Sequence, residues 1–357
     1  MRDDFWDIVK GIGIIAVVTA HATILAIELN WFHLPLFFFV SGFLFSAQKC
    51  LDYGKFFLHK LKTLWKPFVL YNSLFIILHN FFVYIHWIST ENIVGTMIAQ
   101  HISFYEVIKQ IISVLFVGSV DLMCGATWFM APFTVNILLF GILVKFSSGR
   151  SKYLLPFLVL IFFALGIAII KHSAGTILYT DMAMMLLPIT AAGFYLKKFC
   201  VAHNNAGISE IISFRNKKFV AVGAVLFVIS AALFYYLEIN QIFLGLSYAL
   251  KDYFLYMASS FAGIFFTLLA AKMILLVNVT RKIFAFIGKE SFHIMALHFV
   301  GFKILNSIYV LADGQDYNLM AFYTLPEIPK FLYVIFGVGI SLLLRKIFQQ
   351  VSMRLNF

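Results

Sequence analysis

Apolar runs about as long as a membrane is thick recur along almost the whole chain. About ten of them approach 20 residues, the length with which an α-helix crosses a hydrocarbon core of about 30 Å. The predicted spans are residues 8–27, 32–48, 67–87, 128–144, 154–170, 178–196, 219–237, 254–276, 291–311 and 330–347. Because lipid satisfies no backbone hydrogen bonds, each run must form a helix. The sequence therefore predicts an all-α, polytopic membrane protein with about ten transmembrane helices in a lipid bilayer.

Composition agrees with this fold class and argues against several others. Of the 357 residues, 62% are hydrophobic and only 12% are charged, which is far more apolar than a soluble globular protein. The start MRDDFWDIVK is mixed in charge and no small-residue cleavage site follows, so we expect the first run to remain a helix. Three widely spaced cysteines suggest neither a disulfide framework nor a zinc site. With no internal repeat or long linker, one membrane domain is predicted over residues 1–357.

The basic residues indicate the orientation of the spans. With the N-terminus inside, 22 of the 27 Lys and Arg residues fall in the inner connections. The five near the outer side are Lys109, Lys171, Lys251, Lys303 and Lys330. We therefore predict that both termini are cytoplasmic. The net charge of +11 is explained by this topology, and no nucleic-acid partner is expected because no nucleic-acid-binding motif surrounds the basic clusters.

The first run contains a histidine deep inside the predicted membrane. Lys10 and His21 are eleven residues apart, which places them on nearly the same helix face and about 16 Å apart along the axis. If Lys10 marks the inner surface, His21 lies near the middle of the hydrocarbon core. Ionisable groups at that depth are costly and usually functional. The alternative is a histidine that is hydrogen-bonded between packed helices.

Two further histidines are candidates for the same site. His298 follows Lys289 by nine residues, about 13 Å into the ninth span, so a polar site shared with His21 is one interpretation and a structural histidine is the other. His33 lies at the outer boundary of the second span, where it would meet a substrate arriving from outside or simply face the interface.

Five segments together resemble the acyltransferase-3 family of integral-membrane acyltransferases. They are DIVKGIGIIAVVTAH (7–21), FHLPLFFFVSGFLFS (32–46), TWFMAPF (127–133), LPITAAGFYLKK (187–198) and FIGKESFHIMALHF (286–299). The sequence carries Lys10 where that family more often has arginine. It also has Lys60 and Thr63 at the spacing of two family arginines that precede the proline opening the third span. Lysine supplies charge without the bidentate fork of arginine.

The resemblance implies an O-acyltransferase of the bacterial inner membrane. An acetyl group would pass from cytosolic acetyl-CoA to a hydroxyl of a cell-envelope sugar or lipid-linked glycan, with no metal. Such a transfer needs a base for the hydroxyl proton and donors for the oxyanion. His21 is the candidate general base, a covalent acetyl-histidine being the less favoured variant. His298 and His33 are further catalytic candidates.

Substrate-binding residues follow from the same resemblance. The candidates for binding the phosphates of acetyl-CoA are Lys10, Lys60, Lys62 and Lys66. The basic connector 49–66 equally suits an amphipathic helix on anionic lipid, and Lys10 equally suits a lysine that snorkels to the membrane surface. For the acceptor, the candidates are His33, Trp128 and Ser41. Trp128 would equally fit an aromatic belt, and Ser41 with Gly42 would permit close helix approach.

Two other functions remain open from the sequence. A transporter or flippase for glycan intermediates is compatible with ten spans and midplane histidines, although no paired halves with matching broken spans are evident. An O-succinyltransferase differs only in the acyl group and is the second alternative.

Overall fold

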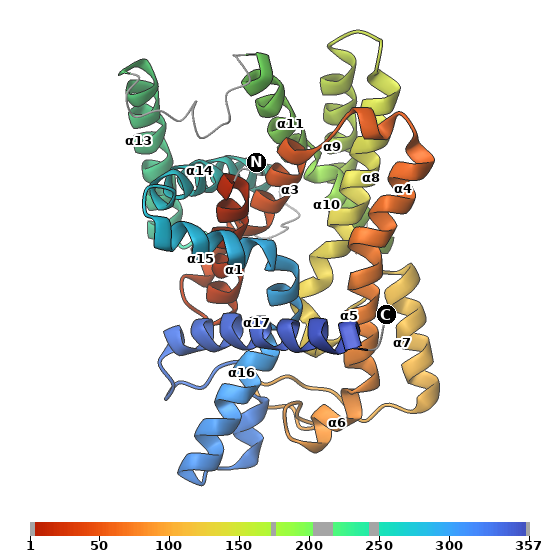
Figure 1. Ribbon diagram of the computed structural model, residues 1–357, viewed down its shortest axis with the longest axis vertical. Coiled ribbons are helices and arrows are strands. Elements are labelled where there is room, and N and C mark those ends of the chain that lie inside the picture. Colours follow the sequence, from red (N-terminus) through yellow and green to blue (C-terminus); the bar gives the residue numbers. More distant parts are fainter. Residues whose placement is uncertain (1–3, 173–175, 203–216, 243–249, 355–357) are drawn as a thin grey trace. The chain divides into compact units, whose positions relative to one another are not determined.

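In a computed structural model of the chain, the described residues are 4–172, 176–202, 217–242 and 250–354 (Figure 1). Regular structure in these ranges is helical, with two isolated β-bridges and no strand. The polar loop over 202–218 and the charges Arg2 and Arg215 lie largely or wholly outside the described residues. An all-α fold is therefore confirmed for the part of the chain that is described.

Within the described ranges, seven helical segments are long and apolar enough to cross a membrane. They are Ala26–Leu44, Leu122–Ser147, Leu154–His172, Val220–Ile239, Tyr253–Ile274, Ser291–Asp313 and Lys330–Gln350. An eighth follows if Ile177–Met185 and Leu187–Ala202, which meet at a bend of 54°, form one broken span. The protein is thus a multi-pass helical membrane protein, as predicted.

Two of the ten predicted spans take a different form. The run 8–27 becomes α1 (Asp4–His21), an 18-residue helix with the charged residues Asp4, Asp7 and Lys10 near its start. The run 67–87 is divided at Leu78 into α5 (Lys66–Ile77) and α6 (His79–Tyr84). The count of ten and the cytoplasmic termini accordingly stay predictions.

The chain forms two compact units, which are described separately. Unit 1 comprises Met1–Gly13, Ile27–Trp65 and Met130–Lys289, and unit 2 comprises Ile14–Ala26, Lys66–Phe129 and Glu290–Phe357. Helix α1 begins in unit 1 and ends in unit 2. The remaining helices of unit 1 are α2 (Ala26–Asn30), α3 (His33–Leu44), η1 (Gln48–Cys50), α4 (Tyr53–Lys60), η2 (Leu61–Trp65), α8 (Met130–Ser147), α9 (Leu154–His172), η4 (Ile177–Tyr179), α10 (Thr180–Met185), α11 (Leu187–Ala202), α13 (Lys217–Ile239), α14 (Leu250–Ile274) and α15 (Asn278–Lys289).

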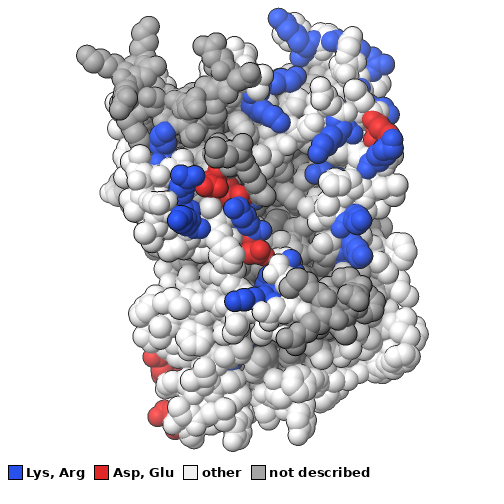
Figure 2. All heavy atoms as spheres, viewed as in Figure 1, with Lys and Arg blue, Asp and Glu red and all other residues white. Residues whose placement is uncertain are grey.

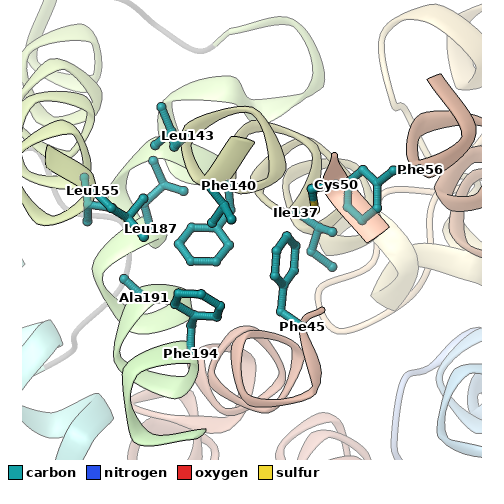
Figure 3. Packing of buried hydrophobic residues seen from close by; sticks show 12 residues of the cluster. Phe45, Cys50, Phe56, Ile137, Phe140, Leu143, Leu155, Leu187, Ala191 and Phe194 are labelled. Carbon is teal, nitrogen blue, oxygen red and sulfur yellow. The ribbon is translucent and has the colours of Figure 1, made fainter. Parts of the chain in front are cut away.

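A cluster of aromatic side chains forms a core of unit 1 (Figure 3). The rings of Phe45, Phe140 and Phe194 meet edge to face, with centroids 5.0 to 6.0 Å apart. Edge-to-face pairs are favoured because the positive edge of one ring meets the negative face of the next. This cluster holds the end of α3 against α8 and α11 (Figure 3).

Helices α3 and α11 approach closely because each has a glycine at the contact. A Cβ atom on Gly42 would lie 1.9 Å from the carbonyl oxygen of Thr190, and one on Gly193 would lie 2.1 Å from that of Phe39. Small residues allow such close approach in membrane helices. The sequence pattern of small residues at 41–42 was therefore a correct indication of helix packing at Gly42.

Unit 2 is built around two long helices, α16 (Ser291–Asp313) and α17 (Lys330–Arg354), which cross in contact (Figure 1). At the crossing, a Cβ atom on Gly301 would lie 2.5 Å from the carbonyl oxygen of Phe336. The remaining helices of this unit are α5, α6, α7 (Phe104–Phe116), η3 (Leu122–Phe129) and η5 (Tyr317–Ala321).

Basic side chains gather at one end of unit 1. Figure 2 shows Lys and Arg over α4 and over the connection between α8 and α9. That connection belongs to the predicted inner side, where basic residues are expected to collect.

Candidate active site

Two histidines lie ring against ring in unit 2. His21 is the last residue of α1 and His298 lies in α16, and their ring centroids are 5.1 Å apart. The ring of Phe299 lies 5.0 Å from that of His21 and 4.3 Å from that of His298. His298 is fully buried, whereas His21 is partly exposed. The structure thus brings together the two histidines that the sequence placed at similar depth.

Hydrogen bonding determines which nitrogen of His298 carries a proton. Its Nδ1 atom lies 2.9 Å from the carbonyl oxygen of Met295 and 3.2 Å from that of Ile294. A carbonyl oxygen only accepts, so Nδ1 must donate, and in the neutral ring Nε2 then holds a lone pair. Nε2 is buried and has no hydrogen-bond partner among the described residues. Such a nitrogen can accept a proton, or a hydrogen bond from an N–H group.

Local backbone and a glycine position the pair. Thr23 (φ 63°) and Leu25 (φ 46°) adopt left-handed conformations, which end α1 just beyond His21. Gly337 of α17 packs against both histidine-bearing segments. A Cβ atom there would lie 3.0 Å from Cγ1 of Val18 and 3.4 Å from Cβ of His298. A larger residue at 337 would push these helices apart.

A basic cavity of about 270 Å³ lies in unit 1. Its polar lining comes from Lys10, Ser41, Ser46, Lys49, His59 and Lys60, and apolar residues complete its walls. Four of these six side chains can carry positive charge, and no carboxylate lines the cavity within the described residues. An anionic ligand with an apolar portion suits such a lining.

Two of the lysines are held in different ways. The ammonium group of Lys60 lies 5.6 Å from the centroid of the Phe56 ring, and burial lowers the pKa of Lys60. Lys10 forms an ion pair of 2.8 Å with Asp7, whose side chain is only 2% exposed. Part of the charge of Lys10 is therefore neutralised before any ligand binds.

Three of the other predicted binding residues, Lys62, Lys66 and His33, do not line this cavity. Lys62 is exposed on η2 and does not line the cavity, and Lys66 is exposed at the start of α5 in unit 2. His33 is buried, and its Nδ1 lies 2.6 Å from the carbonyl oxygen of Leu29.

The two remaining acceptor candidates, Ser41 and Trp128, belong to different units. Ser41 donates to the carbonyl oxygen of Phe38 and lines the basic cavity, whereas Trp128 lies half-buried in η3 of unit 2. In the described ranges, no group of three His, Cys, Asp or Glu side chains is arranged to hold a metal ion.

A protein-family comparison supplies the decisive finding. The model of the acyltransferase-3 family, described as an acyltransferase domain, matches residues 3–346. The chain belongs to the acyltransferase-3 family. The family implies an enzyme that transfers an acyl group within a membrane, between an acyl donor and an acceptor. Neither the curated proteins nor the solved structures gave a match.

For a member of this family, the sequence indicated the lining of the basic cavity incompletely. Lys49 and His59 line it beside Lys10 and Lys60, but neither was among the predicted donor-binding residues. Both belong to the connector 49–66, so its basic character was the available signal. Which of its residues face inward depends on how α4 packs against α8.

A buried polar network that the sequence did not indicate supports α16 near His298. The amide of Asp121 donates to Asn72 Oδ1 (3.0 Å), and Asn72 Nδ2 donates to Thr127 Oγ1 (3.0 Å). Cys124 Sγ donates to the carbonyl oxygen of Ala296 at 3.7 Å. Because buried polar groups are costly when unpaired, this network ties η3 to α16 two residues from His298.

Proposed function

We propose that the protein is a bacterial inner-membrane O-acetyltransferase that moves acetyl from cytosolic acetyl-CoA to a hydroxyl of an envelope sugar or lipid-linked glycan. The observation that carries the proposal is the His21–His298 pair, with a buried Nε2 atom of His298 free to accept. Ten spans with both termini cytoplasmic would present the acceptor side of the enzyme to the exterior.

His21 is the proposed general base. It takes the proton of the acceptor hydroxyl, and the oxygen attacks the thioester carbonyl of acetyl-CoA. The tetrahedral intermediate then expels the coenzyme A sulfur, which takes up the proton that His21 received. The ester C–O bond replaces the thioester C–S bond, so the reaction needs no oxidant or metal.

His298 is the proposed positioning partner of His21. When His21 becomes protonated, the lone pair on His298 Nε2 is the acceptor available beside it. In serine hydrolases a buried carboxylate plays this role: it orients the catalytic imidazole and stabilises its protonated form. Formation of an acetyl-histidine on His21 is the less favoured route.

The basic cavity of unit 1 is the proposed site for the phosphates of acetyl-CoA. Lys60 and Lys10 come from the predicted set, and Lys49 and His59 extend it. Lysine ammonium groups are common phosphate binders as point charges. The apolar walls would accept the pantetheine chain.

The test is acetyl transfer by the purified chain in lipid nanodiscs, with labelled acetyl-CoA as donor and lipid-linked envelope glycans as acceptors. The His21→Ala variant should lose about 10²- to 10⁴-fold in rate, the usual contribution of general-base catalysis. Its thermal unfolding should match that of the original chain. A well-folded His21→Ala variant with full activity would refute the role of His21.

Two rivals are separated by ligand binding. A ligand that binds the native state raises its unfolding temperature. Stabilisation by coenzyme A supports the enzyme, and stabilisation by sugars without any by coenzyme A supports a transporter or flippase. Succinyl-CoA in place of acetyl-CoA distinguishes the O-succinyltransferase alternative.

A further inference from the structure

A second cavity lies in unit 2, formed by the end of α6, the segment that follows it and η5. Its volume is about 440 Å³, within the range of roughly 300–1,000 Å³ typical of small-molecule sites. Its polar lining includes His86, Thr90, Glu91, His101 and Asn318. None of these residues has a part in the proposed proton transfer.

Three polar side chains of this cavity are available to a ligand. Within the described ranges, the side chains of Glu91, His101 and Asn318 make no hydrogen bond. A carboxylate accepts, an amide both donates and accepts, and an imidazole can do either. No lysine or arginine lines the cavity as described, so it differs from the basic cavity of unit 1 and does not suit a phosphate. This set of donors and acceptors matches a neutral ligand with several hydroxyl groups.

Aromatic rings stand beside these polar groups. Tyr84 lines the cavity and is 79% exposed. The ring of His86 stacks on that of Tyr317, with centroids 5.9 Å apart and planes at 24°. An exposed tyrosine offers a flat apolar face and a polar tip. The C–H face of a pyranose ring packs on such a surface while its hydroxyls reach the polar groups.

One short segment joins this cavity to the histidine pair. Ala321 lines the cavity, and two residues further on the ring of Tyr323 lies 5.9 Å from that of Phe299. Phe299 in turn contacts both His21 and His298. The segment 317–323 therefore forms a wall of the cavity and also packs against the ring beside the candidate base.

Hydrogen bonds from two buried residues of α16 hold this segment. Lys303 Nζ donates to the carbonyl oxygens of Ala321 (2.6 Å) and Phe322 (2.9 Å), and Asn306 Nδ2 donates to that of Phe322 (2.8 Å). Lys303 is fully buried and within the described residues has no carboxylate partner. These bonds give the wall of the cavity a defined position relative to α16, the helix that carries His298.

We propose that this cavity binds a neutral sugar ring of the acceptor, with Tyr84 as the stacking surface and Glu91, His101 and Asn318 as hydroxyl partners. The inference rests on the proposed function, and it extends that function by assigning the acceptor to residues that the sequence did not indicate. Both connections that form the cavity belong to the predicted outer side of the membrane, where an envelope glycan is found.

The test measures binding of three probes, methyl α-D-glucopyranoside, methyl β-D-galactopyranoside and methyl N-acetyl-β-D-glucosaminide. Saturation-transfer NMR on the full chain in nanodiscs reports weak binding of such glycosides. At least one should bind, and Glu91→Gln and Tyr84→Ala should each weaken its binding about tenfold, the effect of one lost hydrogen bond or contact.

Matched controls come from helix α7 of the same unit. Tyr105 is 74% exposed, so Tyr105→Ala removes a comparable surface ring. Glu106 caps α7 through Ser103, and Glu106→Gln keeps that cap. Both controls should bind the glycosides as the original chain does. Failure of the original chain to bind any of the three, or equal binding by the cavity variants, overturns the inference.

The outcome is separable from that of the proposed function. Stabilisation by coenzyme A and acetyl transfer to glycans are measured without reference to this cavity. A chain that transfers acetyl but whose cavity variants bind glycosides normally refutes only the sugar site. A chain that transfers no acetyl refutes the proposed function itself.

Discussion

At the scale of single residues, the protonation state of His298 follows from its neighbours in α16. Backbone carbonyls of the preceding turn accept from Nδ1. In the neutral ring Nε2 is therefore the acceptor, and this assignment does not depend on the protonation state of His21. His21 has a different setting, at the partly exposed end of a helix. A buried acceptor beside an accessible imidazole is a suitable arrangement for a base that must reach a substrate.

Replacing His298 should separate orientation from binding. In His298→Gln the acceptor beside His21 loses its basicity, so kcat should fall about 10- to 10³-fold while the KM for acetyl-CoA stays nearly constant. His172→Gln, at the exposed end of α9, is the control and should behave as the original chain. A raised KM with unchanged kcat would contradict a positioning role.

Replacing Lys60 should weaken donor binding. Removing its charge in Lys60→Ala should raise the dissociation constant of coenzyme A about tenfold, the effect of one charge-assisted hydrogen bond. Lys55 is exposed and paired with Asp52 at 2.9 Å, so Lys55→Ala serves as the control. Isothermal titration calorimetry measures both. Equal affinities for the two variants would remove Lys60 from the donor site.

The pH dependence of donor binding offers an independent check. Burial lowers the pKa of Lys60, so its ammonium group loses the proton at a lower pH than a free lysine would. The attraction for phosphate is complete below that pKa and is lost as pH rises through it. Coenzyme A affinity measured between pH 7 and 10.5 should therefore fall earlier for the original chain than for Lys60→Arg, whose guanidinium stays charged. Parallel profiles would contradict this assignment.

At the scale of helices, glycines decide which elements touch. The close approach of α3 and α11 depends on Gly42, where backbone meets backbone. The same device recurs at Gly301 between α16 and α17, whereas Gly337 makes room for neighbouring side chains. Apolar runs without these glycines would still form helices, but those helices could not pack at these distances.

Gly42→Ala should destabilise the fold measurably. The new methyl group would meet the Thr190 carbonyl oxygen at 1.9 Å, and backbone cannot yield as a side chain can. We expect a loss of at least about 1–3 kcal/mol in unfolding free energy, the usual effect of overpacking. Gly223→Ala in α13, where nothing lies within 4 Å, is the control and should be neutral or slightly stabilising. Thermal unfolding in nanodiscs would measure both, and equal stability of the two variants would contradict the close contact.

At the scale of the whole molecule, chain segments distant in sequence share each unit. Unit 2 assembles the end of α1, residues 66–129 and the last two long helices, so its histidine pair joins residues 277 positions apart in the sequence. The basic cavity of unit 1 likewise combines the start of α1 with α3, α4 and α8. Neither arrangement is a property of any single stretch of residues.

The predicted orientation can be measured directly. The native cysteines Cys50, Cys124 and Cys200 are buried, so a membrane-impermeant maleimide should label them little. On intact cells, Asn92→Cys should be labelled because residue 92 follows the third predicted span on the outer side. Ser148→Cys, in the predicted inner connection after α8, should be labelled only after the cells are permeabilised. The opposite pattern would invert the topology.

The sequence by itself determined the all-helical membrane fold, the position of His21 in the first apolar run and the basic character of the connector 49–66. These are local properties, since the length, apolarity and charge of a run decide whether it forms a helix in lipid. It did not determine the count of spans, because charges near the start of α1 and the break at Leu78 alter two of them.

Only the tertiary structure decided which distant side chains meet. The pairing of His21 with His298, the addition of Lys49 and His59 to the basic cavity and the polar cavity around Glu91 all depend on helix contacts. Helix periodicity indicates which residues share a face but not which helix lies against it, and glycines such as Gly42 and Gly301 allow particular helices to approach.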